Sequence, residues 1–108
     1  MRRYLYLIYK KYLFFMSDNK NFYTKLKVQL EDTTSFPSDY MYKFIVPSDS
    51  NQVQEVEEIF NNSGAVISKK KSKTGKYISV SIVLQVESSD SVISYYKKAA
   101  KIKGIISL

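Results

Sequence analysis

The residues best suited to chemistry lie in one short stretch, SKKKSKTGKYISVS, at positions 68–81. Its lysines surround Gly75, so the stretch could bind phosphate or another anion, contact nucleic acid, or form the tip of a hairpin. A phosphate loop of the Walker type needs a glycine, four further residues and then Gly-Lys-Ser/Thr, followed by a helix. Only Gly75-Lys76 fits that pattern, because Tyr77 follows and the alternation after it predicts a strand. The stretch is therefore a poor phosphate loop.

The sequence contains no Cys and no His. Without them the chain lacks the usual general base, the usual soft nucleophile and the usual zinc ligands. The spacing of the remaining carboxylates and lysines does not assemble an acid–base pair either. We therefore expect a protein that is not an enzyme, holds no metal and no cofactor, and works by binding.

The formal net charge of +7 is concentrated at the N-terminus. Residues 1–15, MRRYLYLIYKKYLFF, contain no acid, whereas basic and acidic residues are nearly balanced from Met16 onward. This segment is shorter than the roughly 20 apolar residues of a spanning helix and lacks the unbroken apolar run of a signal peptide. We expect translation to begin at Met16 in a cytoplasmic protein that binds no membrane, with residues 1–15 a non-native or poorly ordered extension. A membrane-surface anchor, a partner-binding helix and an ordinary extra element are the alternatives.

Hydrophobic periodicity divides the rest into an N-terminal helix with its lead-in, residues 16–38, and a domain over residues 39–108. The clearest element is residues 76–87, where apolar and polar side chains alternate with the period of a half-buried strand. Gly75 fits the preceding turn because it tolerates a positive φ. Ser48, Asp49 and Ser50 offer caps for the first helix of the domain. In chain order we expect first a helix over 19–31 and an irregular lead-in that packs Phe36 on the domain. A strand over 41–46 and a helix beginning near Asn51 follow, and then strands over 65–71 and 76–87. The chain closes with a helix that is capped at 88–90 and ends at Gly104, and with a final strand over 104–108.

This order, β-α-β-β-α-β after a leading helix, predicts an α+β fold. A split β-α-β pair of this kind gives a ferredoxin-like sandwich, in which both helices cover one face of an antiparallel sheet. We therefore expect a ferredoxin-like domain with an extra N-terminal helix.

Three segments carry a family resemblance: FPSDYMYKFIVPSD, SKTGKYISVSI and the terminal KGIISL. Over about residues 36–108 the chain resembles the YbeD-like family of small bacterial proteins of unknown function, most specifically from Ser72 to Val80. Members of that family look like ACT domains, ferredoxin-like modules that bind amino acids and regulate metabolic enzymes. The resemblance implies a fold and a cytosolic bacterial setting, and it implies no activity. Ser38 lies near a position where many members carry Cys, so a thiol role cannot apply to this chain.

The expected topology gathers polar residues at one end of the domain. The end of the first strand, the start of the next helix, the 72–76 turn and the end of the last helix all meet there. Unpaired N–H groups at a helix N-terminus bind anions, and nearby lysines would strengthen that binding. The lysines also have plain explanations, because they complement a helix dipole and keep a sheet edge from aggregating. The candidate anion site consists of Ser48, Asp49, Ser50, Lys73, Lys76, Lys101 and Lys103.

The second candidate surface is the face of the sheet that the helices leave open. An RNA-recognition sheet of this fold would carry stacked aromatic side chains there, and Tyr77 alone is a weak platform. The moderately apolar face suits a protein partner better, either a second copy or an unidentified enzyme. We expect a small regulatory or adaptor domain, with RNA binding through the lysine-rich hairpin as the alternative. The candidate partner residues are Met41, Lys43, Ile45, Tyr77, Ser79, Ser81 and Val83.

Overall fold

The structure is a computed structural model that describes residues 20–49 and 51–108. The expectations for residues 1–15 and for Ser50 lie outside the described residues. Over the described part the chain has an α+β fold, with three helices and one four-stranded antiparallel sheet. The helices are α2 (Lys20–Thr33), α3 (Gln52–Ile59) and α4 (Ser89–Ala100), and the strands are β1 (Ser38–Pro47), β2 (Val66–Lys71), β3 (Tyr77–Val86) and β4 (Ile106–Ser107).

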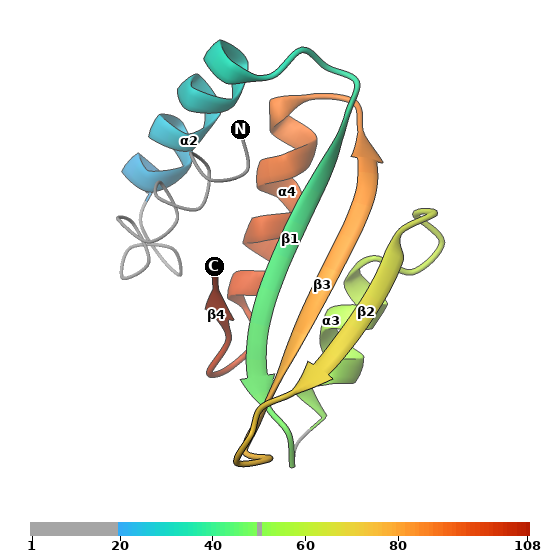
Figure 1. The fold of residues 1–108 in the computed structure, drawn as a ribbon. Coiled ribbons are helices and arrows are strands. Elements are labelled where there is room, and N and C mark those ends of the chain that lie inside the picture. Colours follow the sequence, from blue (N-terminus) through green and yellow to red (C-terminus); the bar gives the residue numbers. More distant parts are fainter. Residues whose placement is uncertain (1–19, 50) are drawn as a thin grey trace.

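The sheet has the strand order β2-β3-β1-β4, and each pair of neighbours is antiparallel (Figure 1). The two central strands pair along their whole length, from Ser38 opposite Val86 to Pro47 opposite Tyr77. Because β3 offers backbone partners over this full length, β1 begins three residues earlier than the residue pattern predicts. The α+β class and the order of the predicted elements are confirmed over the described residues.

The core lies on one face of the sheet, beneath α3 and α4. Alternate residues of β1 and β3 point into it and are buried, and α4 contributes Val92, Tyr96 and Ala99. The Tyr42 hydroxyl donates to the Val92 carbonyl oxygen at 2.9 Å, and the Tyr40 and Tyr96 hydroxyls are hydrogen-bonded at 2.9 Å. These bonds satisfy phenol groups that would be costly to bury alone. The core residues of the two strands are Tyr40, Tyr42, Phe44, Val46, Val80, Ile82, Leu84 and Val86.

Helix α2 packs beside α4 rather than on the sheet (Figure 1). Its buried residues Phe22, Leu26 and Leu30 recur every four positions, which is the spacing of one helix face. Phe36 in the following lead-in is partly buried against the same core, as the sequence predicts. The helices described by the structure include none that is long and apolar enough to cross a membrane.

Helix α4 ends earlier than predicted. Its last helical residue is Ala100, and the chain then turns through residues 101–104, where Lys101 N–H bonds the Lys98 carbonyl and Ile102 N–H bonds the Ala99 carbonyl. Gly104, expected as the helix end, has a φ of 74° and lies in that turn. The final strand is correspondingly short, with only Ile106 and Ser107 paired to β1.

The predicted caps of α3 are wrong where the structure describes them. The N-cap residue is Asn51, and its side chain makes no capping hydrogen bond. The Ser48 hydroxyl instead donates to the Gly75 carbonyl in the β2–β3 turn, and Asp49 is exposed. The Ser48 hydroxyl does not cap α3 because the β2–β3 turn lies directly against the end of β1. Ser48 N–H also donates to the Lys76 carbonyl of this turn, at 2.9 Å.

Candidate functional site

The lysine-rich end of the molecule is built from three separate segments. The residues after β1 contact the β2–β3 turn through Ser48, as described above. The start of α3 contacts the turn after α4, because the Gln52 amide nitrogen Nε2 donates to the Lys103 carbonyl oxygen at 3.1 Å. These contacts bring the loop after β1, the hairpin and the residues after α4 together at the lower end of the view in Figure 1.

The polar side chains at this end do not form a closed cavity. Asp49, Lys73, Lys76, Lys101 and Lys103 are all exposed, and the Ser48 hydroxyl is committed to the Gly75 carbonyl. The Asn51 side chain accepts no hydrogen bond from the first-turn N–H groups of α3. The predicted anion-site residues that the structure describes therefore share one end of the fold, where they present an open, positively charged surface.

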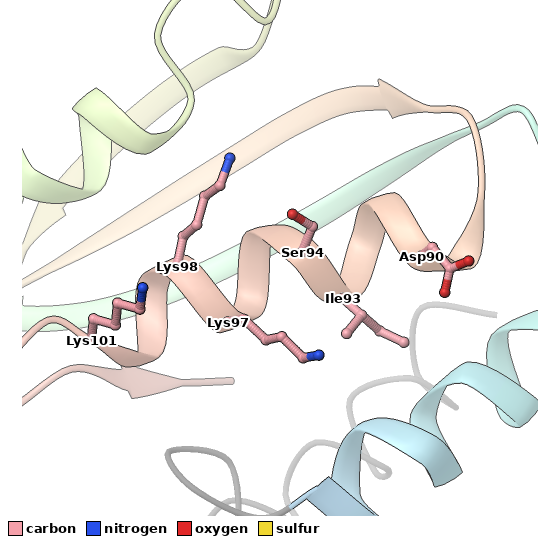
Figure 2. Close-up of a pocket in the computed structure, with 6 residues that line it drawn as sticks. All are labelled: Asp90, Ile93, Ser94, Lys97, Lys98 and Lys101. Carbon is pink, nitrogen blue, oxygen red and sulfur yellow. The ribbon is translucent and has the colours of Figure 1, made fainter.

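A shallow depression of about 360 Å³ lies on the outer face of α4. Its lining residues are Asp90, Ile93, Ser94, Lys97, Lys98 and Lys101. Lys98 and Lys101 point to one side of the helix and Lys97 to the other, so they do not converge on one point (Figure 2). Apart from Lys101 the predicted sites omitted these residues. The signal was available, because they recur at the three- and four-residue spacing of one helix face.

Three of the charged side chains that line the depression contact neighbouring side chains. Lys97 Nζ lies 5.3 Å from the centroid of the Tyr23 ring, and Lys98 Nζ lies 5.5 Å from that of Tyr95, within the range of cation–π contacts. Asp90 pairs with Lys27 of α2 at 3.0 Å, and this hydrogen bond is the main cause that raises the Lys27 pKa above its ordinary value. The Asp90–Lys27 and Lys97–Tyr23 contacts hold α2 against α4, whereas the Lys98–Tyr95 contact lies within α4. Asp90, Lys97 and Lys98 therefore have structural partners.

The sheet face turned away from α3 and α4 is the second predicted site, and we term it the open face. Residues directly opposite in an antiparallel pair point to the same face. The register of β1 and β3 therefore sets all seven predicted residues on this face, as the pairs Met41–Val83, Lys43–Ser81 and Ile45–Ser79, with Tyr77 opposite Pro47.

The outer strands extend the open face. By the same register β2 adds Val66, Ser68 and Lys70, and β4 adds Ile106 beside Ile45. The sequence-based set omitted Val66 and Ile106. Alternation within β2 could have indicated Val66, but Ile106 depends on the pairing of a two-residue strand, which no local pattern specifies.

The exposed apolar side chains gather on the open face. Four large hydrophobic residues are strongly exposed among the described residues: Val28 at 53%, Val66 at 71%, Tyr77 at 48% and Ile106 at 39%. All except Val28 lie on the open face. The charged side chains of this face are Lys43, Lys70 and Asp39, and Asp39 lies opposite Gln85 at the far end of the strands. Along the strands the open face therefore begins with the polar pair Asp39 and Gln85, continues with the apolar row of Val66, Val83 and Met41 and a polar row at Lys43 and Ser81, and is partly apolar again at Ile45, Ile106 and Tyr77.

Comparison with known proteins places the chain in a family without an assigned function. Neither the curated proteins nor the solved structures include a significant match. The model of one family, described as "Protein of unknown function (DUF493)", matches residues 31–108. This match runs from the last residues of α2 through the whole sheet and the two helices that cover it. The chain therefore belongs to the DUF493 family of proteins of unknown function.

Proposed function

We propose that this protein is a non-catalytic regulatory or adaptor domain that binds a protein partner through the open face. The observation that carries the proposal is the concentration of Val66, Tyr77 and Ile106 on that face. Exposed apolar patches of this kind mark interaction sites on soluble proteins. The absence of Cys and His from the sequence supports binding rather than catalysis.

The strand order supports the finer fold assignment on which this role rests. The order β2-β3-β1-β4 with antiparallel neighbours is the one that a split β-α-β pair produces, which favours a ferredoxin-like domain similar to ACT modules. The YbeD-like resemblance of residues 36–108 favours the same architecture and a cytoplasmic setting. In such a domain one sheet face holds the helices, so the other face is the natural place for a partner.

The side chains of the open face fit protein better than RNA. Tyr77 is the aromatic residue of this face in the described sheet, whereas RNA-binding sheets stack several bases on neighbouring aromatics. Val66, Val83 and Met41 form an apolar row across three strands. An apolar row of this kind can pack against apolar side chains on the surface of a second protein.

Site-specific photocrosslinking in cells tests this proposal. A photoreactive amino acid replaces Tyr77 on the open face in one chain and Val28 on α2 in the control, because both positions are about half exposed. We expect discrete protein adducts from position 77 and not from position 28. Equal adducts from the two positions, or none from position 77, would show that the open face is not where this protein meets its partner.

Binding of a small anion at the lysine-rich end is the second candidate. It is favoured by the N-terminus of α3, whose Asn51 side chain makes no capping bond, and by the exposed lysines of the hairpin. We expect millimolar phosphate or glutamate to raise the melting temperature of the wild-type chain but not of Lys73→Ala/Lys76→Ala. No shift with either anion would remove this candidate. A steeply salt-dependent affinity for RNA that falls when Lys71, Lys73 and Lys76 are replaced would favour the nucleic-acid alternative instead.

A further inference from the structure

We infer that the partner of the open face is a second copy of this chain, packed face to face about a two-fold axis that runs along the strands between β1 and β3. The inference rests on the proposed function and specifies its partner. It is carried by the cross-strand register, by the placement of charge on the open face and by the area of that face.

The register makes the open face self-complementary about this axis. The rotation places β1 of one copy over β3 of the other copy, and β2 of one copy over β4 of the other. Met41 then lies opposite Val83 of the second copy, and Pro47 lies opposite Tyr77 of the second copy, because these residues share rows of the sheet. Each contact occurs twice, as an isologous interface requires. Two twisted sheets stacked in this way pack in the aligned manner of β-sandwiches.

The charges of the open face disfavour the alternative symmetric axis. Lys43 lies opposite Ser81 of the second copy, and Asp39 lies opposite Gln85, because each pair occupies one row. Lys70 and Ile106 share the row of Ser79 and Ile45, so the aliphatic part of Lys70 lies over Ile106 of the second copy. A two-fold axis across the strands, centred on the face, would instead set Lys43 against Lys43. Like charges placed opposite each other are destabilising, so that alternative is disfavoured.

The area of the open face matches a weak, reversible dimer. Two strands of ten residues, one of six and one of two, with a rise of about 3.4 Å per residue and a spacing of about 4.8 Å, give a footprint of roughly 450 Å² per copy. The two copies would bury roughly 900 Å² in total, which is below the size of standard interfaces and in the range of weak, transient ones. We therefore expect monomer and dimer to exchange with concentration rather than a permanent dimer.

Sedimentation velocity of the full chain tests the inference. Wild-type chain is expected to shift from monomer to dimer as its concentration rises. Val83→Glu and Met41→Lys each bury an unpaired charge in the dimer, so each is expected to weaken association at least about tenfold. Mixed in equal amounts, the two variants can form one Glu–Lys contact at a Met41–Val83 position and keep the other native, so the mixture is expected to recover dimer. Val28→Glu on α2 is the matched control and is expected to associate like wild type.

The variants also separate the outcomes. Circular dichroism checks their folding, and Tyr77→Lys, at a more exposed position, is a second disrupting change if Val83→Glu does not fold. Monomers that stay apart in the mixture would overturn the proposed axis. A wild-type chain that is monomeric at every concentration would overturn the second copy as partner. The broader proposal would still stand in that case if photocrosslinks from position 77 joined the chain to a different protein.

Discussion

Met41 of β1 and Val83 of β3 lie directly opposite each other in the antiparallel register, on the sheet face turned away from α3 and α4. Val66 of β2 lies on the other side of Val83, so three apolar side chains cross three strands in one row. This row is one apolar part of the surface that a binding partner would cover, because the residues on the opposite sheet face are already buried beneath the helices.

The buried pair of tyrosines predicts non-additive stability. The Tyr40 and Tyr96 hydroxyls are bonded at 2.9 Å inside the core. Removing one hydroxyl, by Tyr40→Phe or Tyr96→Phe, breaks this bond and is expected to lower the free energy of unfolding by about 1–2 kcal/mol. The double variant should lose clearly less than the sum of the two single losses. Urea denaturation of all four chains measures the coupling, and strictly additive losses would show that the bond contributes nothing.

The N-cap of α4 predicts a local stability difference between two serines. The Ser88 hydroxyl accepts a hydrogen bond from Ser91 N–H at 3.2 Å. Ser88→Ala is expected to lower the free energy of unfolding by about 1 kcal/mol, the usual cost of losing a side-chain cap. Ser94→Ala is the matched control, because Ser94 is exposed within α4 and alanine favours a helix. Equal melting temperatures for the two variants would contradict the capping role.

The Lys27–Asp90 pair predicts a shifted titration that joins α2 to α4. The hydrogen bond and the negative charge of Asp90 raise the Lys27 pKa. A raised lysine pKa means that the pair stabilises the fold while Lys27 is protonated and that this contribution is lost as the pH rises through the folded-state pKa. In an NMR titration, the Lys27 side chain of the wild-type protein should therefore have a higher midpoint pH than the Lys27 side chain of the Asp90→Asn variant. Identical midpoints would show that the pair does not persist in solution.

Much of the fold could be predicted from local patterns. The alternation of residues 76–87 indicated β3, and the structure gives Tyr77–Val86. Gly75 was expected to have a positive φ, and its φ is 76°. These features are encoded within a few neighbouring residues, where steric and hydrophobic preferences act directly.

The less predictable features depend on how distant segments pair. The exposure of Ile106 follows from its place opposite Ile45, and the loss of Ser48 as a cap follows from its bonds to the 75–76 turn. The contacts that join α4 to α2 are of the same kind, because Asp90 and Lys97 contact Lys27 and Tyr23. Residue patterns along one element do not specify such contacts between elements.

Cysteine crosslinking tests the central claim most directly, because the sequence contains no Cys and an introduced thiol is unique. Ser81→Cys places a thiol in the middle row of the open face, and Val28→Cys places one on α2 as the control. With a short bismaleimide, we expect rapid formation of covalent dimer from Ser81→Cys and little from Val28→Cys. Dimer formation that is equally fast at both positions, or absent at position 81, would contradict the open face as the surface where two copies meet.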